Sequence, residues 1–122
     1  MKLADVQTVL QAKVIYGEQW LDKEVVCVCG ADLMSDVLVY TKEKTLLLTG
    51  LTNVQVIRTA EMSGLIGIVF VRGKMPGPDV LAMARSKQIP LLMTKHPMFE
   101  ACGMLYQHGL RGCSQLELIV HE

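Results

Sequence analysis

The chain has no excess of charge of either sign, and it has no hydrophobic run long enough to cross a membrane. Twelve Lys and Arg residues balance twelve Asp and Glu residues, so no global field would attract nucleic acid or an anionic membrane surface. The longest stretch without a charged residue, 45–57, has 13 residues, whereas a spanning helix needs ~20. An acid at Asp5 comes too early for a signal peptide. We therefore expect a cytoplasmic protein that binds neither nucleic acid nor membrane.

Cysteine pairs with metal-binding spacing are also absent. The four cysteines include no C-x-x-C pair, and the three histidines do not have zinc spacing. Cys27 and Cys29 share one face of a predicted strand, whereas Cys102 and Cys113 occur singly far downstream. We predict four reduced thiols that pack as small hydrophobic groups in the core, with no metal site and no cofactor.

The common catalytic motifs are missing as well. The phosphate-loop pattern fails because Gly73-Lys74 is followed by Met75, and neither G-x-G-x-x-G nor G-x-S-x-G occurs. His96 has the chemistry of a general base, and a small transferase or hydrolase that uses it is one alternative. A single loop histidine more often hydrogen-bonds locally. We therefore expect a protein that binds rather than catalyses.

What is present is an alternation of short apolar runs with amphipathic stretches. With 51% hydrophobic and 20% charged residues over 122 positions, the chain has the composition of one folded domain. The apolar runs are residues 25–29, 45–49, 65–71 and 89–93. Helical periodicity occurs at residues 3–10, 33–38, 54–62, 80–85 and 98–106. This order predicts an α/β fold with a mostly parallel sheet of four to five strands and helices packed on it.

Polar residues follow each predicted strand, where open parallel sheets bind their ligands. The candidate ligand-binding residues are Thr49, Gly50, Asn53, Arg72, Gly73, Lys74, Thr94, Lys95 and His96. Their cations, together with the free N–H groups of helix N-termini, suit a phosphate or a carboxylate. The alternative interpretation is ordinary turn chemistry, because Gly and Pro are common between strands and helices and loop lysines are often only solvated.

Several segments resemble a known family. The strings YGEQWLDKEV (16–25), GIVFVRGKMP (67–76), PDVL (78–81) and IPLLMT (89–94) resemble the amino-terminal domain of bacterial HPr kinase/phosphorylase and the similar DRTGG domain. The resemblance covers residues 3–108. The literal Asp-Arg-Thr-Gly-Gly string is absent, and the kinase's catalytic domain with its phosphate loop has no counterpart. The resemblance therefore implies the fold and a regulatory role beside enzymes, without kinase activity.

We expect residues 1–122 to form a single DRTGG-like domain. The leading hypothesis is a stand-alone, non-catalytic regulatory module that senses a nucleotide or a phosphorylated metabolite at the strand ends. The alternative is an accessory subunit that docks on a larger enzyme without a small-molecule ligand. Residues 115–120 include four aliphatic side chains, Leu116, Leu118, Ile119 and Val120, and have no place in the alternating core. We therefore also expect a homodimer through this segment or a helix face, the alternative being that the segment folds back as an antiparallel edge strand.

Overall fold

The computed structural model of the chain describes residues 1–113. Within this range helices and strands alternate, with one short 3-10 helix, η1 (Glu18–Trp20). The α-helices are α1 (Leu3–Leu10), α2 (Met34–Tyr40), α3 (Val54–Ser63), α4 (Pro78–Lys87) and α5 (Met98–Gln107). The strands are β1 (Lys13–Tyr16), β2 (Cys27–Gly30), β3 (Thr45–Thr49), β4 (Gly67–Phe70) and β5 (Leu91–Met93). Each apolar run and each helical stretch predicted from the sequence overlaps one of these elements.

The strands form one sheet in the order β1-β5-β4-β3-β2. Strands β2, β3, β4 and β5 run parallel to one another, and a helix connects each of them to the next. Strand β1 is antiparallel to β5, and Lys13 lies opposite Met93. The predicted fold class, a mostly parallel α/β sheet with helices packed on it, is confirmed.

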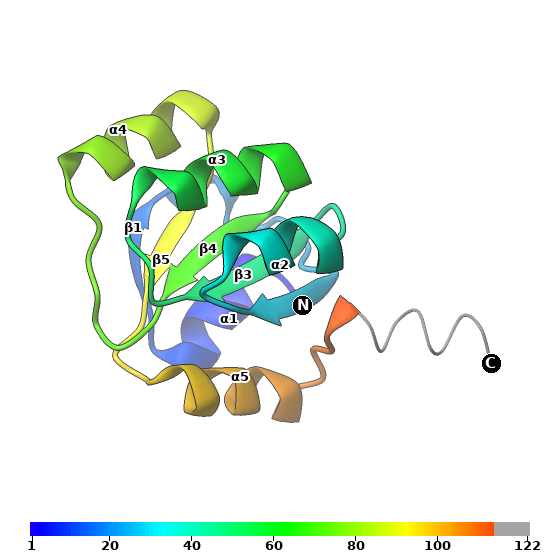
Figure 1. Ribbon diagram of the computed structural model, residues 1–122. Helices are drawn as coiled ribbons and strands as arrows, with labels where there is room; N and C mark the ends of the chain where they lie inside the picture. The colour runs from blue at the N-terminus through cyan, green and yellow to red at the C-terminus, as the bar shows by residue number, and fades with distance from the viewer. Residues whose placement is uncertain (114–122) are drawn as a thin grey trace.

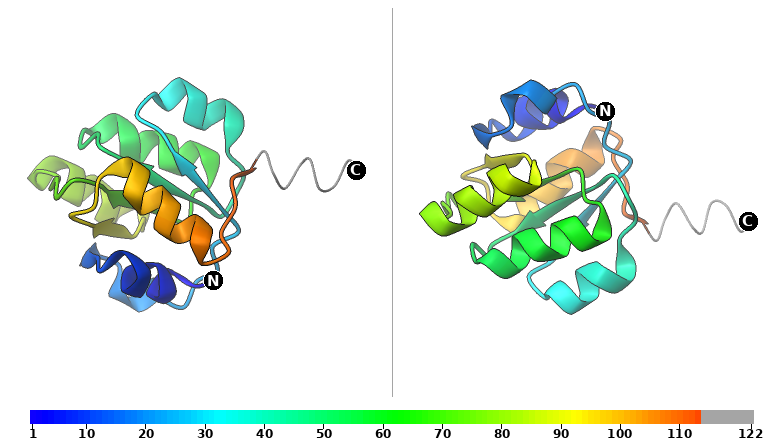
Figure 2. Two further views of the ribbon diagram at one scale, coloured as in Figure 1. Left: turned by 90° about the horizontal axis from the view of Figure 1, so that it is seen from below. Right: turned by 90° about the horizontal axis from the view of Figure 1, so that it is seen from above.

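The helices cover both faces of the sheet. Helices α2, α3 and α4 lie on one face, and α1 and α5 lie side by side on the other (Figures 1 and 2). Successive residues of β3 point into different layers: Leu46 and Leu48 pack toward α1 and α5, whereas Leu47 packs with Ile68 toward α2 to α4. All residues of β3 and β4 are buried, and for this reason neither strand alternates between apolar and charged residues, although β3 begins and ends with a buried threonine.

Helix ends follow local chemistry. Gly64 ends α3 in the left-handed conformation (φ +63°), Pro78 occupies the first turn of α4, and Pro97 is the N-cap of α5. Asn53 is the N-cap of α3, although its side chain makes no capping hydrogen bond. Among residues 1–113, no helix is both long and apolar enough to cross a membrane.

The C-terminal part of the described chain returns to the outer edge of β2. There the Val28 N–H donates to the Arg111 carbonyl (3.0 Å), and Cys27 forms a disulfide with Cys113, with Cα atoms 5.4 Å apart. The prediction of four reduced thiols is therefore wrong for this pair, while the other two cysteines are free. The two cysteines are 86 positions apart in the sequence, and nothing in the sequence indicated their contact. The edge strand predicted for residues 115–120 lies outside the described residues.

Candidate functional site

The ends of the strands meet at one edge of the sheet. The parallel strands β2 to β5 all point their carboxyl ends to this edge, which brings the loops that follow them together. Because β1 runs in the opposite direction, its first residue, Lys13, lies at this same edge beside Met93, the last residue of β5. A basic residue from the start of the chain thus joins the loops that the sequence analysis singled out.

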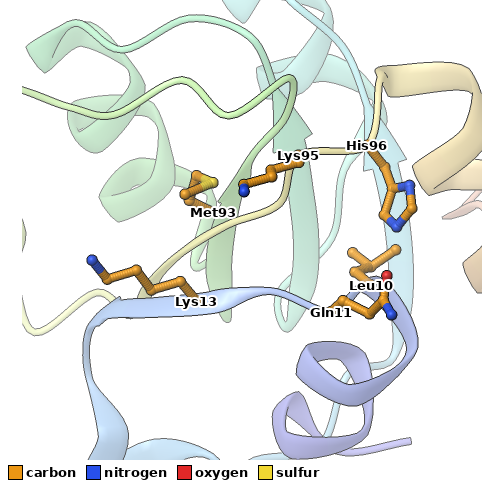
Figure 3. Close-up of a pocket in the computed structure, with 6 residues that line it drawn as sticks. All are labelled: Leu10, Gln11, Lys13, Met93, Lys95 and His96. Atoms are coloured by element: carbon orange, nitrogen blue, oxygen red, sulfur yellow. The ribbon is translucent and has the colours of Figure 1, made fainter.

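A cavity of about 400 Å³ opens at this edge between the end of α1, the start of β1 and the loop after β5. Its lining residues are Leu10, Gln11, Lys13, Met93, Lys95 and His96. Figure 3 shows the imidazole of His96 directed toward Leu10 and Gln11, with Lys13, Met93 and Lys95 further along the opening. The two lysines are exposed, Leu10 is buried, and His96 and Met93 are half-buried. The cavity therefore has an apolar floor and a cationic rim.

Buried hydrogen bonds fix the two walls of the cavity relative to each other. The hydroxyl of Thr94, which is fully buried, donates to the carbonyl of Leu10 (2.8 Å) and accepts from the backbone N–H of His96 (3.3 Å). Gln11 ends α1 in the left-handed conformation (φ +51°), which turns the chain into β1. Thr94 is thus a positioning residue: it joins the end of β5 to the end of α1.

The loop after β4 supports the cavity from one side. Arg72 and Gly73 both have positive φ (+59° and +67°), so the chain turns sharply and their N–H groups donate to the carbonyls of His96 (3.0 Å) and Thr94 (2.8 Å). A Cβ on Gly73 would meet the side chain of Lys95 at 3.9 Å. The side chains of Arg72 and Lys74 are exposed and do not line the cavity.

The loop after β3 belongs to a different group. Its partner is Asp32, which follows β2: one carboxylate oxygen accepts from the Thr49 hydroxyl (3.0 Å) and from the Gly50 N–H (2.8 Å). The Thr49 hydroxyl in turn accepts from the Leu51 N–H (3.2 Å). Asn53 is exposed at the start of α3. These bonds hold the β2 and β3 loops together.

The structure thus divides the nine predicted site residues. Lys95 and His96 line the cavity, Thr94, Arg72 and Gly73 support it through hydrogen bonds, and the other four lie outside it. The sequence analysis missed Leu10, Gln11, Lys13 and Met93. The sequence signal for Lys13 was its position at the start of an extended segment directly after a helix. Its location beside β5 depends on an antiparallel strand pairing, which hydrophobic periodicity does not reveal.

The electrostatics of the cavity favour an anion. Its six lining residues include two lysines and a histidine and no carboxylate. Helix α5 begins two residues after His96, and no side chain caps its first N–H groups, so the positive end of its dipole lies close by. Phosphate oxygens accept hydrogen bonds from ammonium, imidazole and amide N–H groups. The arrangement can therefore hold a phosphate group while an apolar part of the same ligand rests on Leu10 and Met93.

The fold and the cavity together define a small α/β domain with a cationic cavity at its strand ends. The chain belongs to the DRTGG domain family, whose model matches residues 5–108. No curated protein matches the sequence. Its fold is similar to that in the crystal structure of the CBS and DRTGG domains of the regulatory region of Clostridium perfringens pyrophosphatase, complexed with the activator diadenosine tetraphosphate. The TM-score is 0.67 at 16% identity, and the match covers 84% of this chain and 45% of that one.

Proposed function

We propose that this chain is a non-catalytic regulatory module that binds a small anionic ligand, a nucleotide or a phosphorylated metabolite, in the cavity at its strand ends. The observation that carries the proposal is the convergence of Lys13, Lys95 and His96, from two segments far apart in the sequence, on one cavity with an apolar floor. A cavity of about 400 Å³ has the size of small-molecule sites, which range over roughly 300–1,000 Å³.

The family and the structural neighbour support a regulatory role. The neighbour is the regulatory region of a pyrophosphatase, and its activator is a nucleotide. In this chain, a ligand held between the end of α1 and the loop after β5 would bind segments that Thr94 already joins. We propose that residues 1–122 act as one domain, and that ligand binding changes how this domain contacts a larger enzyme.

The first test is a thermal-shift screen with nucleotides and sugar phosphates, followed by calorimetry on any compound that stabilises the chain. Lys95→Ala and Lys13→Ala should each weaken binding by about 1–3 kcal/mol, the range for a lost charge-assisted hydrogen bond. The free energy of unfolding should change little, because both lysines are exposed.

Two control variants locate the site. Lys87→Ala removes an exposed lysine of α4 whose partner is Glu61, and Asn53→Ala changes a strand-end residue that lies outside the cavity. Both should bind the ligand as the unmodified chain does. Equal loss of affinity in all four variants would contradict the cavity as the site. If no compound stabilises the chain, the accessory-subunit hypothesis, which needs no ligand, replaces this proposal.

A further inference from the structure

The edge of the sheet formed by β2 presents an apolar surface to solvent. β2 is the last strand on this side, and among residues 1–113 the stretch from Arg111 to Cys113 lies along its outer edge, held by the bridge between Val28 and Gly112 and by the disulfide to Cys27. Beside it, α2 and its N-cap expose Leu33 (60%), Val39 (70%) and Tyr40 (68%). We refer to these three side chains and the outer edge of β2 as the β2–α2 face. Exposed apolar side chains that lie close together form surfaces that other chains tend to cover.

The helix and the strand edge are parts of one continuous surface. A cavity of about 350 Å³ lies between them, lined by Val28 and Cys29 of β2, Tyr40 of α2, and Gly112 and Cys113. The exposed tyrosine at the end of α2 therefore lies next to the strand edge. An apolar side chain that docks from outside would find an apolar recess beside the exposed Tyr40.

The chain leaves the described fold at this same face. The disulfide to Cys27 fixes Cys113 there, and Gly112 lies opposite Val28 in parallel register. The nine residues that follow Cys113 therefore start at this face.

Nine residues follow Cys113, and their sequence suits a docking strand. Leu116, Leu118 and Val120 alternate with Glu117 and Ile119, so a strand of this sequence has one wholly aliphatic face. At ~3.3 Å per residue, nine extended residues span roughly 30 Å, enough to reach a neighbouring molecule. The chain has a formal net charge of +0, so two copies do not repel each other at long range.

We propose that the β2–α2 face is a dimer interface on which residues 114–122 of a second copy of this chain dock, so that two copies exchange these segments about a twofold axis. Exchange covers the β2–α2 face of both copies, because each copy provides one docking segment and one such face. Self-complementary contacts of this kind close as twofold dimers. The interface lies at the edge of the sheet opposite β1 and the cationic cavity, and it does not depend on ligand binding.

Sedimentation equilibrium of the full chain tests the proposal. The unmodified chain should have twice its monomer mass in the micromolar range. The double variant Val39→Glu/Tyr40→Glu and deletion of residues 114–122 should each raise the dimer dissociation constant by at least about tenfold. Met62→Glu is the matched control, since Met62 is 73% exposed on α3, outside this face. Circular dichroism establishes that each variant is folded.

A mixing experiment distinguishes segment exchange from other dimers. The deleted chain retains its β2–α2 face, and the double variant retains its segment, so a mixture of the two should form a heterodimer that neither forms alone. Native mass spectrometry separates the two masses. A chain that stays monomeric to 200 µM, as it would if the segment covered its own fold, overturns the proposal. Dimers that survive both changes, or a mixture without heterodimer, overturn it as well.

Discussion

Cys29 and Cys102 are the free cysteines of residues 1–113, and both are half-buried. Burial raises the pKa of the Cys102 thiol. Burial also raises the pKa of the Cys29 thiol, and the nearby Cys102 and Asp36 raise it further. The thiolate is the reactive form of cysteine, so both side chains should be weak nucleophiles near neutral pH.

Iodoacetamide labelling followed residue by residue with mass spectrometry checks this expectation. In the folded chain, the labelling rates of both thiols should reach half-maximum at a higher pH than in urea. Because the unfolded thiols lose their protons first, the free energy of unfolding should fall as the pH rises above the unfolded pKa, and it should level off above the folded pKa. Equal midpoints in the folded and unfolded chains would contradict the effect of burial.

Individual cavity-lining residues could be predicted from the sequence only where a general rule relates a position in the sequence to a location in the fold. Lys95 and His96 follow a parallel strand, and the carboxyl ends of such strands are where ligands bind. Thr49 and Gly50 met the same criterion, yet they hydrogen-bond to Asp32 and stabilise a loop. The rule identifies an edge of the sheet, while the cavity depends on which loops touch.

Among the secondary-structure elements, the contact between the end of β5 and the end of α1 positions the cavity. It rests on one buried hydroxyl, that of Thr94, which donates to the Leu10 carbonyl at 2.8 Å. Thr94→Val keeps the side-chain shape but leaves this carbonyl without its donor. We expect the free energy of unfolding to fall by about 1–3 kcal/mol.

Urea denaturation measures this loss, and Thr94→Ser, which keeps the hydroxyl, should recover most of it. Ligand affinity in the same variants gives a second measurement: Thr94→Val should weaken binding although the residue does not line the cavity. Unfolding curves for Thr94→Val and Thr94→Ser that superimpose would show that the hydrogen bond does not contribute.

Element types were predictable because each element carries its own periodicity, but strand ends were not. The apolar run at residues 65–71 forms a strand only from Gly67 to Phe70, because Leu65 and Val71 are buried in the loops on either side. The run at 25–29 gives an edge strand that begins at Cys27 and is partly exposed. Hydrophobicity reports burial, which extends beyond the hydrogen-bonded part of a strand.

For the whole molecule, the disulfide between Cys27 and Cys113 is the longest-range covalent constraint in the described residues. It joins two residues that are 86 positions apart, and a cross-link of that span restricts the unfolded chain strongly. Cys113→Ala should therefore lower the free energy of unfolding by about 2–5 kcal/mol under non-reducing conditions.

Cys102→Ala provides the comparison, because it removes a half-buried thiol without breaking a cross-link. Its effect should be smaller, and adding reductant should bring the unmodified chain to the stability of Cys113→Ala. Thiol titration of the denatured, unreduced chain should give two free thiols. Four free thiols would show that the bond is absent.

The order of strands in the sheet was beyond the reach of the sequence. Helical and apolar patterns predicted a mostly parallel sheet, and right-handed connections narrow its topology. Nothing in residues 13–17 indicated that this segment would pair with β5, the last strand of the described fold, in antiparallel register. That pairing takes Lys13 to the cavity, so the unpredicted pairing explains why Lys13 was not among the predicted site residues.

The pairing of β1 with β5 also determines when this protein can finish folding during its synthesis. Tyr16 leaves the ribosome 75 residues before its partner Leu91, a delay of roughly 4–15 s at ordinary translation rates. Until then β1 has no strand to join, and α1 lacks α5, beside which it lies in the finished fold. The first segment to be made is thus among the last to be placed, and a nascent chain that stalls before β5 exposes α1 and β1 to chaperones and proteases.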